Sequence, residues 1–149
     1  MAGRLRRFLY DTSIFIYALG GEHSYREPCR EIARLAAVGD LQGEASVDLL
    51  QELTHQRARR TGNRRDAAKV ARSVAMLAWW HPVEPNDVQR GIDLFETHEG
   101  LDAQDAVFAA VAINRGIDAI LTTDRAFDGI DGLERIDPGD ERAVARLIG

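Results

Sequence analysis

The chain contains one cysteine, one lysine and no apolar run long enough to cross a bilayer among its 149 residues. The single cysteine, Cys29, cannot form an internal disulfide or build a thiolate zinc site, since both require several thiols. Any metal ion would therefore be held mainly by oxygen, which favours magnesium or manganese over zinc. No signal peptide is visible, because no long apolar region or cleavage site follows the first residues. We expect a cytoplasmic protein without a membrane segment.

Length and composition are typical of a globular domain. Hydrophobic residues make up 45% and charged residues 29% of the sequence, which favours neither disorder nor a fibrous class. The chain is long enough for one hydrophobic core and too short for two ordinary domains. No repeat, linker or low-complexity tract divides it, so we expect one domain over residues 1–149.

Positive charge is concentrated in one segment. The net charge of −5 argues against nucleic-acid binding by bulk charge, yet basic residues, nearly all arginine, crowd residues 57–72. An arginine-rich pair of solvated helices and a phosphate-binding patch are both consistent with this pattern. Acidic residues elsewhere would hide such a patch from the net charge.

Apolar periodicity predicts alternating strands and helices. This alternation favours an α/β sandwich with a mostly parallel sheet. The predicted strands cover residues 6–10, 41–45, 79–83, 119–121 and 133–136, and the predicted helices cover residues 11–19 and 25–38, a stretch from Ser46, and residues 63–77, 85–98, 102–114 and those from about 140.

Carboxylates occupy positions from which they could converge. Asp11 and Asp124 each follow a predicted strand directly, and ligands of parallel sheets bind beyond the carboxyl ends of strands. Asp102 and Asp105 share one face of a helix, while Glu52 lies among leucines on another helix. Acids gathered in one cup would repel each other and raise their pKa values. One or two hard cations would relieve that repulsion.

Each of these acids also has a simpler interpretation. Asp11, Asp102 and Asp124 are placed to cap the helix or turn that follows. Asp105 falls in a first helical turn, where an acid suits the helix dipole, and Glu52 alone would be a solvated helix residue. We favour Asp105 over Asp102 as a ligand, with Asp102 in a supporting position.

Phosphodiester hydrolysis is the chemistry that an acidic metal cup supports. The four histidines have no ligand spacing, and no catalytic cysteine or phosphate-binding glycine loop offers a competing mechanism. A signalling receiver domain also gathers acids at strand ends. It would require two adjacent acids after the first strand and a lysine near the last, and both are absent.

Four segments resemble the PIN-domain ribonucleases, and more narrowly the VapC toxins of type II toxin–antitoxin pairs. The segments occur in family order: Asp11-Thr12-Ser13 after an apolar strand, a glutamate on the third helix, DAVFAAVA at 105–112 and LTTDRAF at 121–127. The resemblance implies a three-layer α/β/α fold and cleavage of RNA with Mg²⁺ or Mn²⁺.

The resemblance also implies roles for individual residues. Asp11, Glu52, Asp105 and Asp124 match the catalytic, metal-binding quartet, and the hydroxyls of Ser13 and Thr122 match supporting positions. Asp48, one turn before Glu52, is an alternative to it. The family further implies a homodimer and a small antitoxin whose tail enters the acidic groove.

Two alternatives within the PIN fold remain open, namely a nuclease that matures RNA and a binding module without catalysis. For a nuclease, the arginine segment suggests contacts with the RNA backbone. We predict that four arginines provide them: Arg59, Arg60, Arg64 and Arg65.

Overall fold

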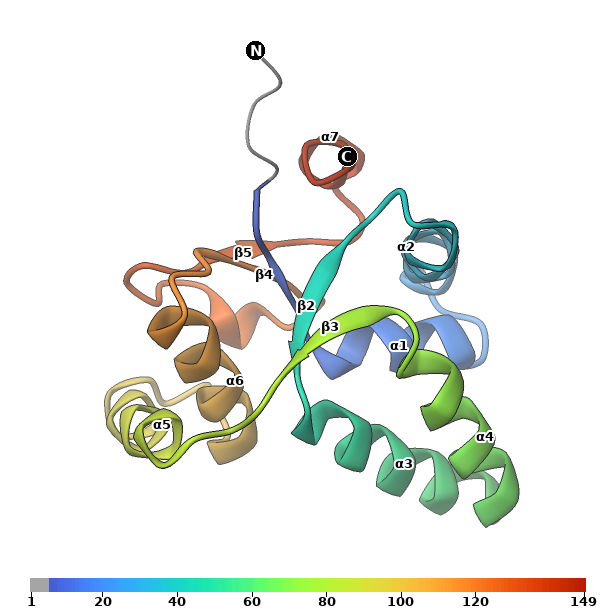
Figure 1. Ribbon diagram of the computed structural model, residues 1–149, viewed down its shortest axis with the longest axis horizontal. Coiled ribbons are helices and arrows are strands. Elements are labelled where there is room, and N and C mark those ends of the chain that lie inside the picture. Colours follow the sequence, from blue (N-terminus) through green and yellow to red (C-terminus); the bar gives the residue numbers. More distant parts are fainter. Residues whose placement is uncertain (1–5) are drawn as a thin grey trace.

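The computed structural model describes residues 6–149 and places a five-stranded sheet at the centre of this part of the chain (Figure 1). The strand order is β3-β2-β1-β4-β5, and every neighbouring pair is parallel. The predicted parallel sheet is therefore confirmed. The strands are β1 (Leu9–Tyr10), β2 (Gly43–Ser46), β3 (Ala78–His81), β4 (Ala119–Leu121) and β5 (Glu134–Ile136).

Helices cover both faces of the sheet, which gives the predicted three layers. In Figure 1 the first four helices lie to the right of the sheet, and α5 and α6 lie to its left. Right-handed crossovers explain this, because the chain first moves from β1 towards β3 and then returns to β4 in the opposite direction. The helices are α1 (Thr12–Leu19), α2 (Arg26–Val38), α3 (Asp48–Thr61), α4 (Arg64–Val74), α5 (Pro85–Thr97), α6 (Ala103–Asn114) and α7 (Glu141–Ala145), with a 3₁₀ turn, η1 (Arg125–Phe127).

The strand order reverses between β1 and β4, which creates a switch point at their carboxyl ends. Asp11 follows β1 and donates its backbone N–H to the carbonyl of Leu121 at the end of β4, at 3.0 Å. Segments that lie far apart in the sequence are thereby joined at one place. Crevices of this kind are where ligands bind in open α/β sheets.

The core depends on close approaches that only small residues permit. Gly43 of β2 lies under the Tyr10 ring, and a Cβ added there would come within 2.1 Å of a ring carbon. Gly91 of α5 lies against Val107 of α6, where an added Cβ would come within 2.9 Å of a methyl group. The latter contact lets α5 pack closely on α6, whose residues 108–112 are fully buried.

Two predicted boundaries were wrong at the second strand. It covers Gly43–Ser46 instead of residues 41–45, and the next helix begins at Asp48 instead of Ser46. Ser46 is buried and paired with His81 of β3, so it belongs to the sheet. The Ser46 hydroxyl donates a hydrogen bond to the carboxylate of Asp48, and Asp48 is the first residue of α3. The first strand is also shorter than predicted, at Leu9–Tyr10.

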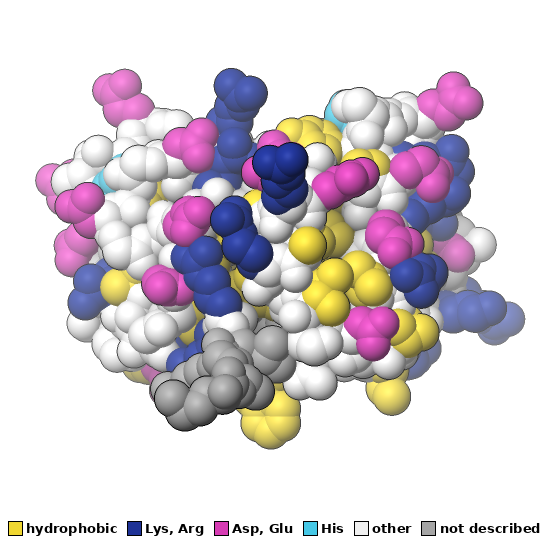
Figure 2. Space-filling view, turned by 90° about the horizontal axis from the view of Figure 1, so that it is seen from above, with side chains coloured by type: hydrophobic (Ala, Val, Ile, Leu, Met, Phe, Trp, Pro, Cys, Tyr) yellow, Lys and Arg dark blue, Asp and Glu magenta, His cyan; other side chains and the backbone are white. Residues whose placement is uncertain are grey.

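Opposite charges are paired at the amino ends of the strands. Figure 2 shows this face, where basic and acidic side chains lie beside one another. Arg6 bonds Asp118 at 3.2 Å and Glu134 at 2.7 Å, and Arg7 bonds Glu44 at 2.7 Å. The two exposed pairs of Arg6 contribute little stability, whereas the Glu44 side chain in the Arg7 pair is largely buried. Within residues 6–149, no helix has the length and apolar character needed to cross a bilayer.

Candidate active site

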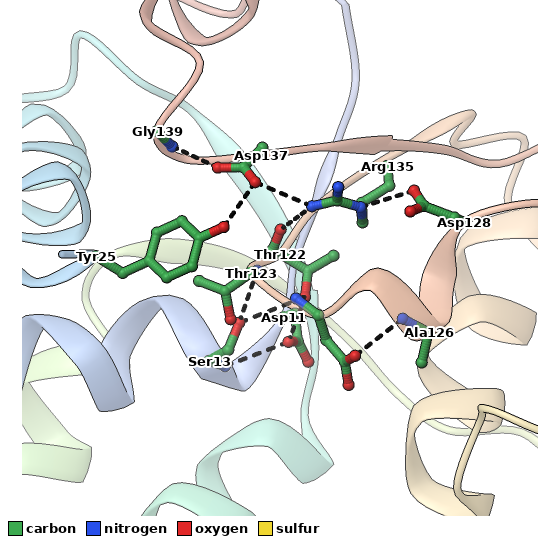
Figure 3. Close-up of polar contacts among 11 residues, drawn as sticks. Asp11, Ser13, Tyr25, Thr122, Thr123, Ala126, Asp128, Arg135, Asp137 and Gly139 are labelled. Atoms are coloured by element: carbon green, nitrogen blue, oxygen red, sulfur yellow. Dashed lines mark hydrogen bonds and ion pairs between the residues drawn. The ribbon is translucent and has the colours of Figure 1, made fainter. Parts of the chain in front are cut away.

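Asp11 lies at the centre of the switch point. Its side chain caps α1 by accepting the Ser13 backbone N–H at 3.4 Å, and it accepts the Thr122 hydroxyl at 2.7 Å (Figure 3). The residue is only 4% exposed. Burial raises the pKa of the Asp11 carboxyl, and the hydrogen bonds from Ser13 and Thr122 oppose that rise. Asp11 is thus both a helix cap and a buried acid that has no cationic partner among residues 6–149.

Two hydroxyl side chains join the ends of β1 and β4. The Ser13 and Thr122 hydroxyl oxygens are 3.4 Å apart. Ser13 Oγ accepts the Thr123 N–H at 3.2 Å, and Thr122 Oγ1 accepts the Asp124 N–H at 3.0 Å. The structure therefore brings both predicted supporting residues into contact with the segments that carry Asp11 and Asp124. Their role in catalysis stays a prediction.

Glu52 points from α3 towards the start of α1. Its carboxylate accepts the Thr12 hydroxyl at 2.7 Å and the Gln56 side-chain amide at 2.8 Å. Burial raises the pKa of Glu52, the hydrogen bond from Thr12 lowers it, and neighbouring carboxylates such as Asp11 raise it further. Asp48, the alternative acid, is engaged by the Ser46 hydroxyl. Glu52 is therefore the α3 acid that faces the switch point.

Asp102 and Asp105 occupy the start of α6 in different roles. Asp102 caps the helix, because its carboxylate accepts the Asp105 N–H at 2.8 Å. The pKa of Asp105 is raised to about 8, first by burial and then by the negative charges of Asp11, Asp102, Asp124 and Glu52. All four predicted acids and the Asp102 cap therefore share one electrostatic environment.

Asp124 lies at the exposed rim of this group. Its carboxylate caps η1 by accepting the Ala126 N–H at 2.9 Å (Figure 3). The capping interpretation is confirmed, and it leaves room for the predicted ligand role, because the cap uses one carboxylate oxygen and the other has no hydrogen bond within the described residues. The ligand role itself stays a prediction.

The donor set fits a hard divalent cation in its chemistry, although the acids are not yet arranged as ligands. None of the ion pairs among residues 6–149 involves Asp11, Glu52, Asp105 or Asp124. In the same range no three acidic, histidine or cysteine side chains lie close enough to hold a metal ion together. The acids can nevertheless raise the pKa of Asp105, because electrostatic repulsion acts over longer distances than metal–oxygen bonds of about 2 Å. The residues fit by oxygen chemistry and by uncompensated charge.

A cavity of about 720 Å³ opens beside Glu52, and two of the four predicted RNA-binding arginines line it. Arg59 and Arg60 line it together with His55 and three glutamine side chains. Arg64 and Arg65, at the start of α4, lie outside its lining. Of the four predicted arginines, Arg59 and Arg60 are therefore the two that share this cavity with Glu52.

Arg135 is a residue that the sequence did not single out. Its guanidinium donates to the Thr122 carbonyl at 3.3 Å, to Asp137 at 3.2 Å and to Asp128 at 2.7 Å (Figure 3). Tyr25 donates its hydroxyl to the same Asp137 at 2.7 Å. This network holds the segment after β4 against α2. No local pattern indicates it, because its members meet only through the sheet.

Fold and site together define the class of protein. A family model described as PIN domain matches residues 7–126, and the chain belongs to that family. The resemblance seen in the sequence is therefore confirmed.

Relatives with an established name place the chain more narrowly among the VapC ribonucleases. Ribonuclease VapC7 of Mycobacterium tuberculosis is 37% identical over 142 residues, which cover 93% of this chain and 96% of the relative. Ribonuclease VapC23 of the same species is 31% identical over 116 residues, covering 76% of this chain and 90% of the relative.

Solved structures share the fold at lower identity. The chain matches a DNA-bound VapBC from Salmonella typhimurium with a TM-score of 0.68 and 18% identity, covering 90% of this chain and 99% of that one. It matches VapC20 of Mycobacterium tuberculosis, described as a Sarcin-Ricin loop cleaving toxin, with a TM-score of 0.65 and 18% identity over 85% and 98% of the two chains. The predicted three-layer fold is confirmed.

Proposed function

We propose that this protein is an endoribonuclease toxin that hydrolyses RNA phosphodiesters with Mg²⁺ or Mn²⁺ held by Asp11, Glu52, Asp105 and Asp124. One observation carries the proposal: acids from four elements lie near enough to one another around the switch point to raise the pKa of Asp105, and no described arginine or lysine pairs with them. The ribonuclease names of the relatives support it.

Hydrogen bonds from neighbouring residues orient two of the acids, Asp11 and Glu52. When bound, the cation supplies the charge that activates water and stabilises the leaving oxygen of the phosphodiester. Thr122 and Ser13 fix the orientation of Asp11, and Thr12 fixes Glu52. Such bonds limit side-chain rotation, and this fixed geometry is a large part of catalytic efficiency.

Metal removal tests the proposal directly. Incubation of purified protein with a mixed cellular RNA and excess EDTA is expected to stop cleavage, because the acids repel each other and the RNA phosphates without a cation. Excess Mg²⁺ or Mn²⁺ should restore cleavage, as seen by gel electrophoresis of the RNA. Cleavage that continues in EDTA at the same rate would contradict the metal-dependent mechanism.

The cavity beside Glu52 offers a path for the RNA backbone. Guanidinium groups bind phosphate through paired hydrogen bonds, and Arg59 and Arg60 line the cavity that also contains Glu52. We therefore propose that these two arginines hold the strand that enters the site. The remaining predicted contacts, Arg64 and Arg65, lie further along the same basic segment.

Reversing the charge of both cavity arginines is expected to weaken RNA binding. The Arg59→Glu/Arg60→Glu protein should also show a smaller salt dependence, by about 1.4 in the slope of log affinity against log salt if two phosphate contacts are lost. Fluorescence anisotropy of a labelled single-stranded RNA at several salt concentrations measures both quantities. Arg142→Glu/Arg146→Glu, at two exposed arginines in and directly after α7, is the matched control with the same net charge. Equal effects from both pairs would show that net charge, not the cavity, controls binding.

We also propose a small antitoxin and a second copy of the chain as partners. Toxin–antitoxin complexes are among the solved structures that share this fold. On the outer face of α5, Val88, Ile92 and Phe95 are 41%, 60% and 51% exposed at helical spacing. This apolar stripe supports self-association.

We further propose that the protein acts in the cytoplasm. The single buried thiol of Cys29 is consistent with that reducing compartment.

A further inference from the structure

Three aromatic rings cluster at the surface between α1 and α2. The ring centroids of Tyr17 and His23 are 4.6 Å apart, and those of Tyr17 and Tyr25 are 5.5 Å apart. His23 and Tyr25 stack with an interplanar angle of 14° at 5.8 Å. His23 is exposed and the two tyrosines are half-buried. The cluster is thus an aromatic surface, not part of the core.

The aromatic cluster borders the candidate active site. Tyr17 lies one turn after Ser13 on the same face of α1, because residues four apart are neighbours on a helix. Tyr25 is joined to the segment after β4 by hydrogen bonds through Asp137 and Arg135 to the Thr122 carbonyl (Figure 3). Two separate connections therefore place the rings beside the hydroxyl residues that hold Asp11.

The aromatic cluster and the arginine cavity lie on different flanks of the acids. Thr12 and Ile16 form the face of α1 that turns towards α3, where Thr12 bonds Glu52 and Ile16 lines a small cavity together with Leu53. Ser13 and Tyr17 form the adjacent face, on which Ser13 bonds Thr122 and Thr123 directly after β4. A strand that crosses the acids would meet guanidinium groups on one flank and aromatic rings on the other.

Two arginines act electrostatically on Tyr25. The hydrogen bond to Asp137 raises the pKa of the Tyr25 phenol, and the charges of Arg135 and Arg125 oppose that rise. Arg125 is exposed and follows Asp124 in the chain. Proteins that bind unpaired nucleotides use aromatic rings, on which the bases stack, together with basic side chains that contact the neighbouring phosphates.

We propose that the Tyr17, His23 and Tyr25 cluster is a stacking platform for an unpaired base of the RNA strand, next to the scissile phosphate. This inference rests on the proposed ribonuclease function and adds to it a contact site for a base, separate from the acids and from the arginine cavity. His23 provides the most accessible ring, and Tyr17 and Tyr25 support it from the two helices.

The test separates stacking from backbone contacts by comparing two probes. One is a labelled 12-nucleotide oligoadenylate, and the other is an abasic strand of the same length, which keeps the phosphates and lacks the bases. Binding is measured by fluorescence anisotropy with Mg²⁺ in the Asp11→Asn protein, so that the RNA stays intact. His23→Ala is expected to weaken binding of oligoadenylate roughly tenfold, with no change for the abasic strand.

A conservative variant gives the second arm of the test. His23→Phe keeps an aromatic ring, so it should restore the oligoadenylate affinity that His23→Ala loses. Equal losses for both probes would indicate a disturbed backbone path and overturn the platform, as would unchanged binding in His23→Ala.

These failures are distinguishable from failure of the ribonuclease function. A wild-type protein that cleaves RNA with Mg²⁺, combined with unchanged binding in His23→Ala, overturns the platform alone. A wild-type protein that cleaves no RNA, combined with no binding of either probe, overturns both proposals.

Discussion

Asp11→Asn is expected to lower RNA cleavage by at least roughly a hundredfold while the protein stays folded, since even residues that only support metal ligands cost ten- to a hundredfold when changed. The amide has the shape of the carboxylate, and its oxygen can still accept the Thr122 hydroxyl. The substitution also removes a charge from a residue that is 4% exposed. In the absence of divalent cations, its free energy of unfolding should therefore equal or exceed that of the wild type. Single-turnover cleavage and urea denaturation measure the two effects.

The same variant separates the alternative functions in a bacterium. Induced wild-type protein is expected to arrest growth and to produce new RNA ends, and the Asp11→Asn protein should do neither. Asp93→Asn, the same change at an exposed acid of α5, is the control and should behave as the wild type. Equal cleavage by wild type and Asp11→Asn would remove Asp11 from the mechanism. Cleavage without growth arrest would favour RNA maturation, and a folded wild type that never cleaves would favour a binding module.

Asp87→Ala is expected to be the most destabilising of the single substitutions considered. The Asp87 side chain is 1% exposed and bonds the Arg115 guanidinium at 2.9 Å. It also accepts the Asn114 amide and the Glu84 N–H, both at 2.8 Å, so it ties the start of α5 to the end of α6. Removing it leaves the Arg115 charge, 18% exposed, without its partner. Losing one member of a buried pair costs about 3–5 kcal/mol, measurable by urea denaturation at pH 7.

The effect of Asp87 should depend on pH in a defined direction. Burial raises the pKa of Asp87, but the hydrogen bonds from Arg115, Glu84 and Asn114 outweigh it, and the pKa lies below the ordinary 3.8. The folded state therefore holds the proton less tightly than the unfolded state, and the contribution to stability is complete above pH 3.8. It is lost as the pH falls through the folded-state pKa.

Denaturation at neutral and acidic pH checks this expectation. The difference in unfolding free energy between wild type and Asp87→Asn should be largest near pH 7 and should shrink below the ordinary pKa. Asp93→Asn is again the control and should show little difference at either pH. A difference for Asp87→Asn that stays constant from pH 7 into acid would show that the carboxylate charge is not what stabilises the α5–α6 contact.

The order of elements and the positions of the acids follow from local sequence. Buried strands, helical spacing and caps are properties of a few neighbouring residues, so the pattern around Asp11, Asp102 and Asp124 predicted both the elements and the caps correctly. Boundaries failed at Ser46, where pairing with β3 keeps a good helix-capping residue in the sheet. That pairing is a tertiary fact that no local window contains.

The partners of the acids were decided by the tertiary structure alone. Thr12 meets Glu52 across 40 residues and Thr122 meets Asp11 across 111, because the strand order reverses at β1 and brings both segments to one crevice. The same reversal sets Tyr25 against Asp137, 112 residues away. The sequence by itself determines which side chains are present, and their carboxylates and hydroxyls indicate chemistry with a hard metal ion. Which of them meet depends on how the chain crosses the sheet, since contacts between distant segments form only once the whole core has packed.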